Sequence, residues 1–357
     1  MVKSLKKQFL NILLVVMLAL VAFLLVRSSN EELNFDSIGE FFAKCNLWFI
    51  GAAVVCMLLY IIFEALSVHV ILKDFGYSPK LHQSLAYSTS DVYYSGITPS
   101  ATGGQPASAF YMIRDGVDGG TACFGLVFNL IGYTAALIII GAVVLVLNIP
   151  MFMSFSMPVK ILTAGGLVVQ AALGMFFVIC IAKQSIVMRV GSFFIRLLHG
   201  IKILKKKEKW QKKLEGVVEK YGNCYECFKT QKLLFIKVLV LNVLQRASLI
   251  GVSVFVCVSA VDCNAWTMFA MQTFVMLGYN FIPLPGGTGA FEYLYLNVYD
   301  GVFETEFIFI AMMITRTISY YASMVVSGVY TLVYHVLGSK KESKKASSAV
   351  AEEANGQ

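Results

Sequence analysis

The chain has 357 residues, of which 58% are hydrophobic and only 14% are charged, and its mean hydropathy is +0.73. These values exclude a soluble domain and indicate a polytopic membrane protein. The apolar runs are continuous rather than alternating, so we predict an all-α protein and not a transmembrane β-barrel. The net charge of +8 does not indicate a nucleic-acid partner, because Lys and Arg cluster beside the apolar runs and so report orientation in the membrane.

Four apolar runs in the first half of the chain are predicted to cross the bilayer, at ~20 residues per crossing. The first, residues 9–26, follows Lys3, Lys6 and Lys7 and has no small-residue cleavage site after it. We therefore predict an uncleaved first span whose N-terminus lies inside. The other three spans are predicted at residues 47–72, 121–147 and 159–182.

A stretch between the second and third of these spans, residues 97–114, cannot be an unbroken helix. Pro99 and Pro106 lack a backbone donor, and Gly103-Gly104 is the least helical pair available. At membrane depth such backbone is tolerated only where it is buried in protein or lines a polar cavity. We therefore predict a broken, re-entrant element that opens inward and ends in a short helix over residues 107–114.

Residues 183–232 carry thirteen Lys or Arg against four Glu, and the positive-inside rule predicts that this loop is cytoplasmic. Its Arg189, Phe193 and Phe194 suit a helix that lies on an anionic leaflet, and a solvated basic connector is the alternative interpretation. Cys224 and Cys227 form a lone C-x-x-C, which does not predict a metal site without a second pair.

The second half of the chain repeats the pattern of a span followed by a break. Residues 233–260 form a predicted span, and residues 266–282 run into a second Pro-Gly break at residues 283–292. The residues after this break are acidic, so it is predicted to open outward, before a last span at residues 307–336. Two interrupted segments in corresponding halves are typical of a transporter's binding site, and their opposite orientation is what an inverted repeat would produce.

The predicted organisation is thus about six full spans and two broken elements, with both termini in the cytoplasm of a cell-membrane protein. It comprises an N-terminal membrane half, the basic loop, a C-terminal membrane half and a disordered tail, at residues 1–182, 183–232, 233–336 and 337–357 respectively.

The residues at the two breaks suit an anion-binding site. Helix halves direct their N-terminal N–H groups and positive dipole ends into the protein, where they favour an anion such as a phosphate. Arg246 and Arg316 each cost roughly 2.5 to 3.5 kcal/mol at the centre of a span, so each is expected to face a partner or a cavity. The predicted phosphate-binding residues are Thr98, Thr102, Gly103, Gly104, Gln105, Arg114, Arg246, Gly286, Gly287, Thr288, Glu292 and Arg316, with Glu64 as a charge partner.

Structural interpretations of these residues stay open. Glycines also let helices approach closely, Arg–Glu pairs also hold bundles together, and Arg114 also suits an interfacial position. His69 and His82 are isolated, so no metal or other cofactor is predicted. The sequence contains no G-x-S-x-G, P-loop or H-E-x-x-H motif that would indicate hydrolase, ATPase or zinc-protease chemistry.

Two motifs carry a resemblance to a known family: Thr98-Pro-Ser-Ala-Thr-Gly-Gly-Gln-Pro106 with Arg114-Asp-Gly116, and Pro283-Leu-Pro-Gly-Gly-Thr-Gly-Ala-Phe-Glu292 with Arg316. In this order they resemble the flippase-like transmembrane region of bacterial lysylphosphatidylglycerol synthases, over nearly the whole chain. The resemblance implies a lipid-handling membrane protein. In the full-length relatives this region moves an aminoacylated phospholipid from the inner to the outer leaflet. The sequence ends shortly after the last predicted span, where those relatives carry the domain that transfers lysine from its tRNA, so no lysyltransferase activity is expected.

The leading hypothesis is a translocase that moves a phospholipid or a polyprenyl-phosphate-linked lipid across the cytoplasmic membrane. Its expected partners are lipids with anionic headgroups and a separate lipid-synthesis enzyme. Two alternatives stay open. One is a membrane-embedded lipid-modifying transferase, or a subunit of one, with Glu64, Asp91 or Glu292 as general base. The other is a non-catalytic scaffold for envelope-synthesis enzymes.

Overall fold

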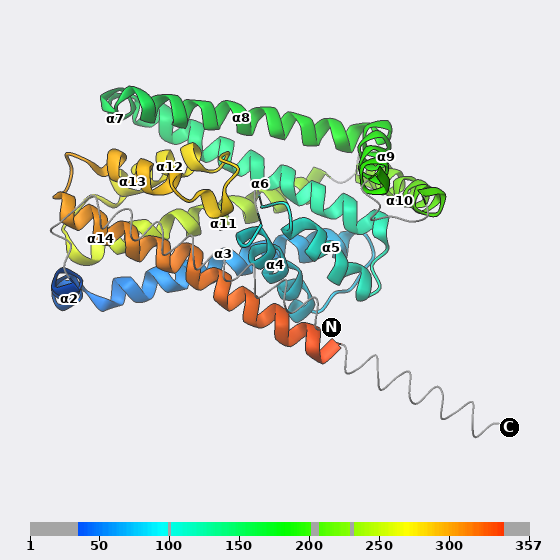
Figure 1. The fold of residues 1–357 in the computed structure, drawn as a ribbon, viewed down its shortest axis with the longest axis horizontal. Coiled ribbons are helices and arrows are strands. Elements are labelled where there is room, and N and C mark those ends of the chain that lie inside the picture. Colours follow the sequence, from blue (N-terminus) through cyan, green and yellow to red (C-terminus); the bar gives the residue numbers. More distant parts are fainter. Residues whose placement is uncertain (1–34, 99–100, 201–206, 229–231, 339–357) are drawn as a thin grey trace, which may run out of the picture.

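The computed structural model describes residues 35–98, 101–200, 207–228 and 232–338, and the elements in these ranges are helices (Figure 1). Five of the described helices are long and apolar enough to cross a membrane. They are Leu47–Asp74 (α3), Gly119–Leu147 (α6), Met157–Ala182 (α8), Lys232–Ala260 (α11) and Thr305–Gly338, whose first part is α14 (Thr305–Arg316). The predicted first span, residues 9–26, and most of the predicted tail lie outside the described residues.

Shorter helices connect these spans. They are α2 (Phe35–Lys44), α4 (Leu81–Gly96), α5 (Gly104–Arg114), α7 (Ile149–Ser154), α9 (Gln184–Gly200), α10 (Lys207–Phe228), α12 (Ala265–Tyr279), the short 3-10 helix η2 (Pro285–Gly287) and α13 (Ala290–Tyr299). The last span contains a π-helical segment, η3 (Thr317–Ala322). Segments of this kind are frequent at functional sites. The connection predicted between the third and fourth spans as a loop contains α7, with Pro150 in its first turn, where a missing N–H costs little.

The first break is a helical hairpin formed by α4 and α5. Thr98 closes the break, because its hydroxyl donates to the Tyr94 carbonyl (2.6 Å) and accepts from the Gly103 N–H (2.9 Å). α5 begins at Gly104, three residues before the predicted start at 107, since Pro106 fits the first helical turn. Tyr77, just before α4, donates to Asp118, just after α5 (2.5 Å). The hairpin therefore enters and leaves at the same end of the molecule, as a re-entrant element does.

The second break joins α12 to α13, which returns beside it. Gly286, Gly287 and Gly289 all have positive φ, at 60°, 65° and 87°, a backbone conformation that favours glycine. Figure 1 shows α12 and α13 in the half of the molecule toward α2 and α7, whereas α4 and α5 lie in the half toward α9 and α10. The two hairpins thus enter the bundle from opposite ends. The inverted repeat that would account for this arrangement stays a prediction.

The spans differ in how deeply they are buried. Only 17% of the residues in the apolar core of α8 are buried, against 56% in the last span. Large apolar side chains of α8 are exposed, among them Val168, Met175 and Phe176. Such a surface suits contact with lipid chains. α8 therefore lies at the edge of the bundle, whereas the apolar part of the last span is more deeply buried.

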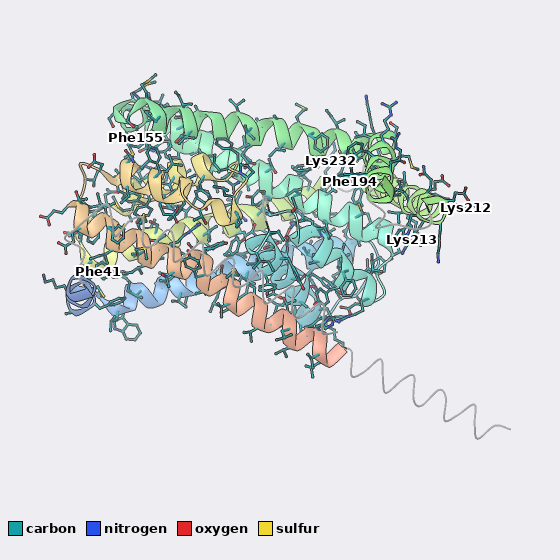
Figure 2. All side chains as sticks on the ribbon, in the orientation of Figure 1. Phe41, Phe155, Phe194, Lys212, Lys213 and Lys232 are labelled. Atoms are coloured by element: carbon teal, nitrogen blue, oxygen red, sulfur yellow. The ribbon has the colours of Figure 1, made fainter. Side chains whose placement is uncertain are left out.

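The predicted basic loop contains two packed helices, α9 and α10. Gly191 of α9 lies against Leu214 of α10, and Gln211 donates to the Ser192 hydroxyl (3.3 Å). Phe193 and Phe194 are exposed on α9, and Figure 2 labels Phe194 there. This arrangement fits the interpretation of a helix on a lipid surface. Cys224 and Cys227 lie on α10, and their side chains lie outside the described part of the structure.

Candidate functional site

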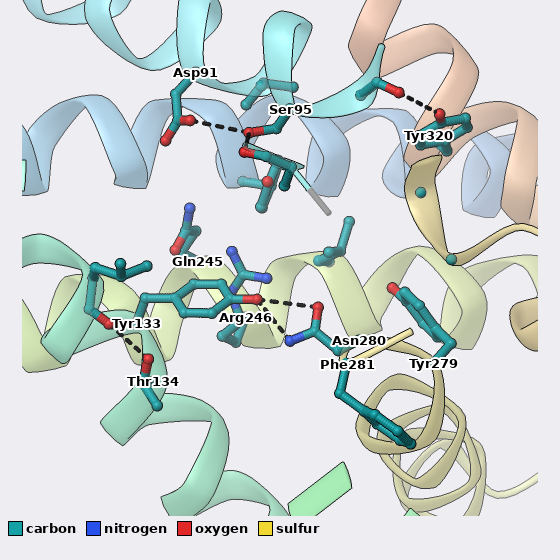
Figure 3. A pocket seen from close by; sticks show the side chains of 18 of the residues that line it. Asp91, Ser95, Tyr133, Thr134, Gln245, Arg246, Tyr279, Asn280, Phe281 and Tyr320 are labelled. Carbon is teal, nitrogen blue, oxygen red and sulfur yellow. Dashed lines mark hydrogen bonds between the residues drawn. The ribbon is translucent and has the colours of Figure 1, made fainter. Parts of the chain in front are cut away.

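A cavity of about 580 Å³ lies between the two helical hairpins (Figure 3). Its wall is contributed by α3, α4, α5, α6, α8, α11, the end of α12, the second break and the last span. Much of the lining is polar even though the surrounding helices are apolar. The polar side chains are Tyr60, Glu64, Asp91, Ser95, Gln105, Asn129, Tyr133, Thr134, Gln170, Asn242, Gln245, Arg246, Tyr279, Asn280, Arg316, Ser319, Tyr320 and Ser323.

Arg246 of α11 is the central cation of this cavity and is 5% exposed. Its guanidinium carbon lies 4.0 Å from the ring centroid of Tyr133 (α6) and 5.2 Å from that of Tyr60 (α3). Its Nε atom is buried without a hydrogen-bond partner, and no ion pair between Arg246 and a described carboxylate is found. The two rings therefore hold the guanidinium in place while leaving its hydrogen-bonding capacity available to an anion.

Two acidic side chains lie near Arg246. Glu64 of α3 is 7% exposed and accepts a hydrogen bond from Gln245 Nε2 (3.2 Å). Asp91 of α4 accepts from Ser95 Oγ (3.1 Å) and from Gln105 Nε2 (2.8 Å), and both carboxyl groups line the cavity. Figure 3 shows Asp91 and Ser95 facing Gln245 and Arg246 across the cavity.

Gly104 allows this approach of α5 to the Asp91 carboxylate. A Cβ atom at Gly104 would lie 1.8 Å from Asp91 Oδ1 and 2.1 Å from Ser95 Oγ. Any side chain here would therefore displace the acidic group from Gln105. Gly104 thus acts on the site through packing and not through direct contact with the cavity.

Arg316, at the end of α14, holds the second break together. Its Nη2 atom donates to the Gly286 carbonyl (2.7 Å) and to Thr288 Oγ1 (3.2 Å), and its Nε atom lies 3.3 Å from Glu292 Oε1. Glu292 also accepts from the Gly289 N–H (2.6 Å) at the start of α13. The Arg316–Glu292 ion pair is thus present and fixes the backbone of the break, and of its two members Arg316 lines the cavity.

The predicted site residues separate into two groups. Those that line the cavity are Glu64, Gln105, Arg246, Gly286, Gly287 and Arg316. Those that do not are Thr98, Thr102, Gly103, Gly104, Arg114, Thr288 and Glu292. Most of the second group shape or hold the breaks. Arg114 is the exception: it lies between the rings of Tyr111 (4.9 Å) and Tyr334 (4.8 Å) with its Nε atom 3.5 Å from Asp115 Oδ1.

Sequence reasoning missed Tyr60, Tyr133 and Asn280, which also line the cavity. Tyr60 and Tyr133 stack on Arg246, and the Tyr133 hydroxyl is hydrogen-bonded to the Asn280 side chain, with distances of 2.9 and 3.2 Å. A weak signal existed for two of them, because Tyr60 lies one helical turn before Glu64 and Asn280 lies just before the second break. The sequence gives no such signal for Tyr133, since a single tyrosine in an apolar run also suits simple packing.

The family described as the lysylphosphatidylglycerol synthase TM region matches residues 9–327 of the chain. The chain belongs to this family. The match includes both breaks and the helices that form the cavity, and it confirms the resemblance found from the two motifs. This member of the lysylphosphatidylglycerol synthase TM-region family is a multi-pass membrane protein. Among curated proteins, none matches the sequence significantly.

Proposed function

We propose that this protein translocates a lipid across the membrane and that Arg246 binds the phosphate of the lipid headgroup in the central cavity. The supporting observation is a buried arginine that lines a cavity between two re-entrant hairpins and has no ion pair with a described carboxylate. Ionisable groups in a membrane are costly, so they mark transport pathways or binding sites when they face a cavity. Arginine suits a phosphate because its planar guanidinium binds two oxygens at once.

The cavity is suited to a headgroup rather than to a whole lipid. Its volume of about 580 Å³ lies within the usual range of ligand sites and is smaller than a lipid with two acyl chains. On the α8 side its lining becomes apolar, with Val169, Leu173 and Phe177. Since α8 is the least buried of the described spans, we propose that the acyl chains extend into lipid past this helix while the headgroup crosses through the cavity.

The two hairpins supply a means of alternating access. Each enters from one end of the bundle, and their inner ends meet at the cavity. Movement of either hairpin would open the cavity toward its own end, as in transporters built around discontinuous helices. By the positive-inside rule, the end that carries α9 and α10 is proposed to face the cytoplasm.

Reconstituted protein tests the proposal directly. Liposomes that contain the protein should exchange a fluorescent phosphatidylglycerol between leaflets faster than empty vesicles. Arg246→Gln should slow exchange at least about tenfold, because a charge-assisted hydrogen bond contributes about 1.5–3 kcal/mol. Arg196→Gln, a change of an exposed arginine on α9, is the matched control and should retain the rate. Failure to accelerate phosphatidylglycerol, phosphatidylethanolamine and a polyprenyl phosphate alike would refute lipid translocation.

One arrangement in the cavity also favours a second candidate function. Glu64 and Asp91 line the same cavity as Arg246. A lipid-modifying transferase would use such a carboxylate as general base and the arginine to stabilise the charge of the phosphate. Mass spectrometry of lipids incubated with the purified protein decides between the two. A covalent change in a headgroup would support the transferase, and unchanged lipids that nevertheless exchange leaflets would support translocation.

A further inference from the structure

Glu64 and Asp91 line the same cavity as Arg246, and no described carboxylate forms an ion pair with that arginine. Two ionised carboxylates in one cavity repel each other, and a single guanidinium balances the charge of only one of them. Because burial of an uncompensated charge is costly, the two carboxyl groups together favour holding one proton. The contacts of the pair come from neutral donors, namely Gln245, Ser95 and Gln105.

The charges around this pair balance when it holds one proton. The other ionisable groups that line the cavity are Tyr60 (α3), Tyr133 (α6), Arg246 (α11), Tyr279 (α12), and Arg316 and Tyr320 (last span). Arg316 is already balanced by Glu292. Arg246 then supplies one positive charge and the singly protonated pair supplies one negative charge, which leaves the empty cavity neutral.

An anionic headgroup changes this balance. A phosphate monoanion bound to Arg246 neutralises the guanidinium, and the charge of the Glu64–Asp91 pair is then left uncompensated in a poorly hydrated site. Such a charge is costly, and a second proton on the pair removes it. An acceptor for that proton is present, because Gln245 Oε1 is buried without a hydrogen-bond partner on the same amide whose Nε2 donates to Glu64.

We propose that the Glu64–Asp91 pair is a proton-binding site that takes up one proton whenever an anionic lipid headgroup binds to Arg246, so that lipid and proton cross the membrane together. This inference rests on the proposed function. The proton comes from the aqueous phase to which the cavity is open and adds to a carboxylate oxygen, and no bond of the lipid forms or breaks. The proton gradient would then drive the movement of the lipid.

Proton uptake on lipid binding is the first test. Phosphatidylglycerol is added to the purified full-length protein in weakly buffered detergent with a pH-indicator dye. We expect uptake of about one proton per bound lipid, and an affinity that rises by up to about tenfold for each unit by which the pH is lowered. A variant carrying both Glu64→Gln and Asp91→Asn should abolish the uptake, because no carboxyl group is then left beside Arg246 to take the proton. Its melting temperature checks that it folds. Glu306→Gln, at an exposed carboxylate, is the control and should retain it. Binding without proton uptake would overturn the inference.

Two further measurements separate the inference from the proposed function. In liposomes, a proton gradient should change the rate of phosphatidylglycerol exchange in the unmodified protein but not in the variant that carries both Glu64→Gln and Asp91→Asn. An exchange rate that does not depend on the gradient would overturn proton coupling without contradicting translocation. If no lipid binds at all, the proposed translocation is refuted. Infrared spectroscopy of the lipid-free protein then tests the proton site independently of lipid. A carbonyl stretch of a protonated carboxylic acid that is present in the unmodified protein and disappears in Glu64→Gln and in Asp91→Asn would support the shared proton. Absence of this stretch from the unmodified protein would overturn it.

Discussion

Tyr320 of the last span donates a hydrogen bond of 2.8 Å to the carbonyl oxygen of Gly96, at the end of α4. Its ring also lies against Gly286 in the second break, where a Cβ atom would come within 2.3 Å of it. One side chain therefore contacts both broken elements. Tyr320 lies in the π-helical segment, which turns its ring toward the cavity. The arrangement of either hairpin is thereby linked to that of the other.

Replacement of Tyr320 by Phe should remove the hydrogen bond to Gly96 while keeping the packing of the ring against Gly286. The Gly96 carbonyl would lose its donor, and we expect the free energy of unfolding to fall by about 1 kcal/mol. We also expect the leaflet-exchange rate to change, because the contact would have to break each time one hairpin moves. Tyr293→Phe is the control, since that ring is 41% exposed. Unchanged exchange in Tyr320→Phe would show that the bond persists during transport.

Gly286→Ala should be among the most damaging single-methyl changes in the protein. Its φ of 60° is unfavourable for alanine, and the new methyl group would overlap the Tyr320 ring. Melting temperature and exchange should both fall. Gly51→Ala is the matched control, because a Cβ atom there meets nothing within 4 Å and the residue lies in α3. A normal melting temperature for Gly286→Ala would mean that the break adopts a different conformation.

The Arg316–Glu292 pair can be separated from phosphate binding by a double variant. Arg316→Ala alone should destabilise the protein by about 3–5 kcal/mol, since it leaves a buried carboxylate and the Gly286 carbonyl unpaired. If the pair mainly supports the break, Arg316→Met with Glu292→Gln should recover both fold and exchange, and we expect this outcome. The sequence-based prediction that Arg316 binds phosphate leads to the opposite result, a folded but inactive double variant.

Cysteine labelling in intact cells checks the orientation. Cysteines at Ser78 and Lys209 should be shielded from a membrane-impermeant thiol reagent, and one at Glu304 should react, in a background without native cysteines. All three positions are exposed. Ser78 and Lys209 should behave alike, because Tyr77 is bonded to Asp118 and the adjacent Gly119 packs against Val217 of α10. Labelling of both from outside would reverse the proposed orientation.

Asp118 makes the stability of the protein depend on pH. Partial burial raises the pKa of its carboxyl, but hydrogen bonds from Thr121, Tyr77 and the Gly120 N–H outweigh burial and lower the pKa below its ordinary value of 3.8. A carboxyl with a lowered pKa stabilises the folded state above the unfolded-state pKa, and the effect is lost as pH falls through the folded-state pKa.

Asp118→Ala should therefore reduce the free energy of unfolding by about 1–2 kcal/mol at neutral pH, as expected for the loss of a helix N-cap. The difference from the unmodified protein should shrink below about pH 4. Thermal melts in detergent across this pH range measure it. A difference that does not vary with pH would show that packing, and not the charge, is what the variant loses.

The sequence by itself determined the features that depend on local composition. Hydropathy located the five described spans, and Pro and Gly located both breaks, because these properties act within one segment. It also placed Arg246 and Arg316 inside spans and offered Glu292 as a partner. Only the tertiary structure decided that Arg316 is paired while Arg246 rests between Tyr60 and Tyr133, and that Arg114 lies away from the cavity. Tyr133 and Arg246 are brought together by the packing of α6 on α11, and no local pattern in either helix encodes that contact.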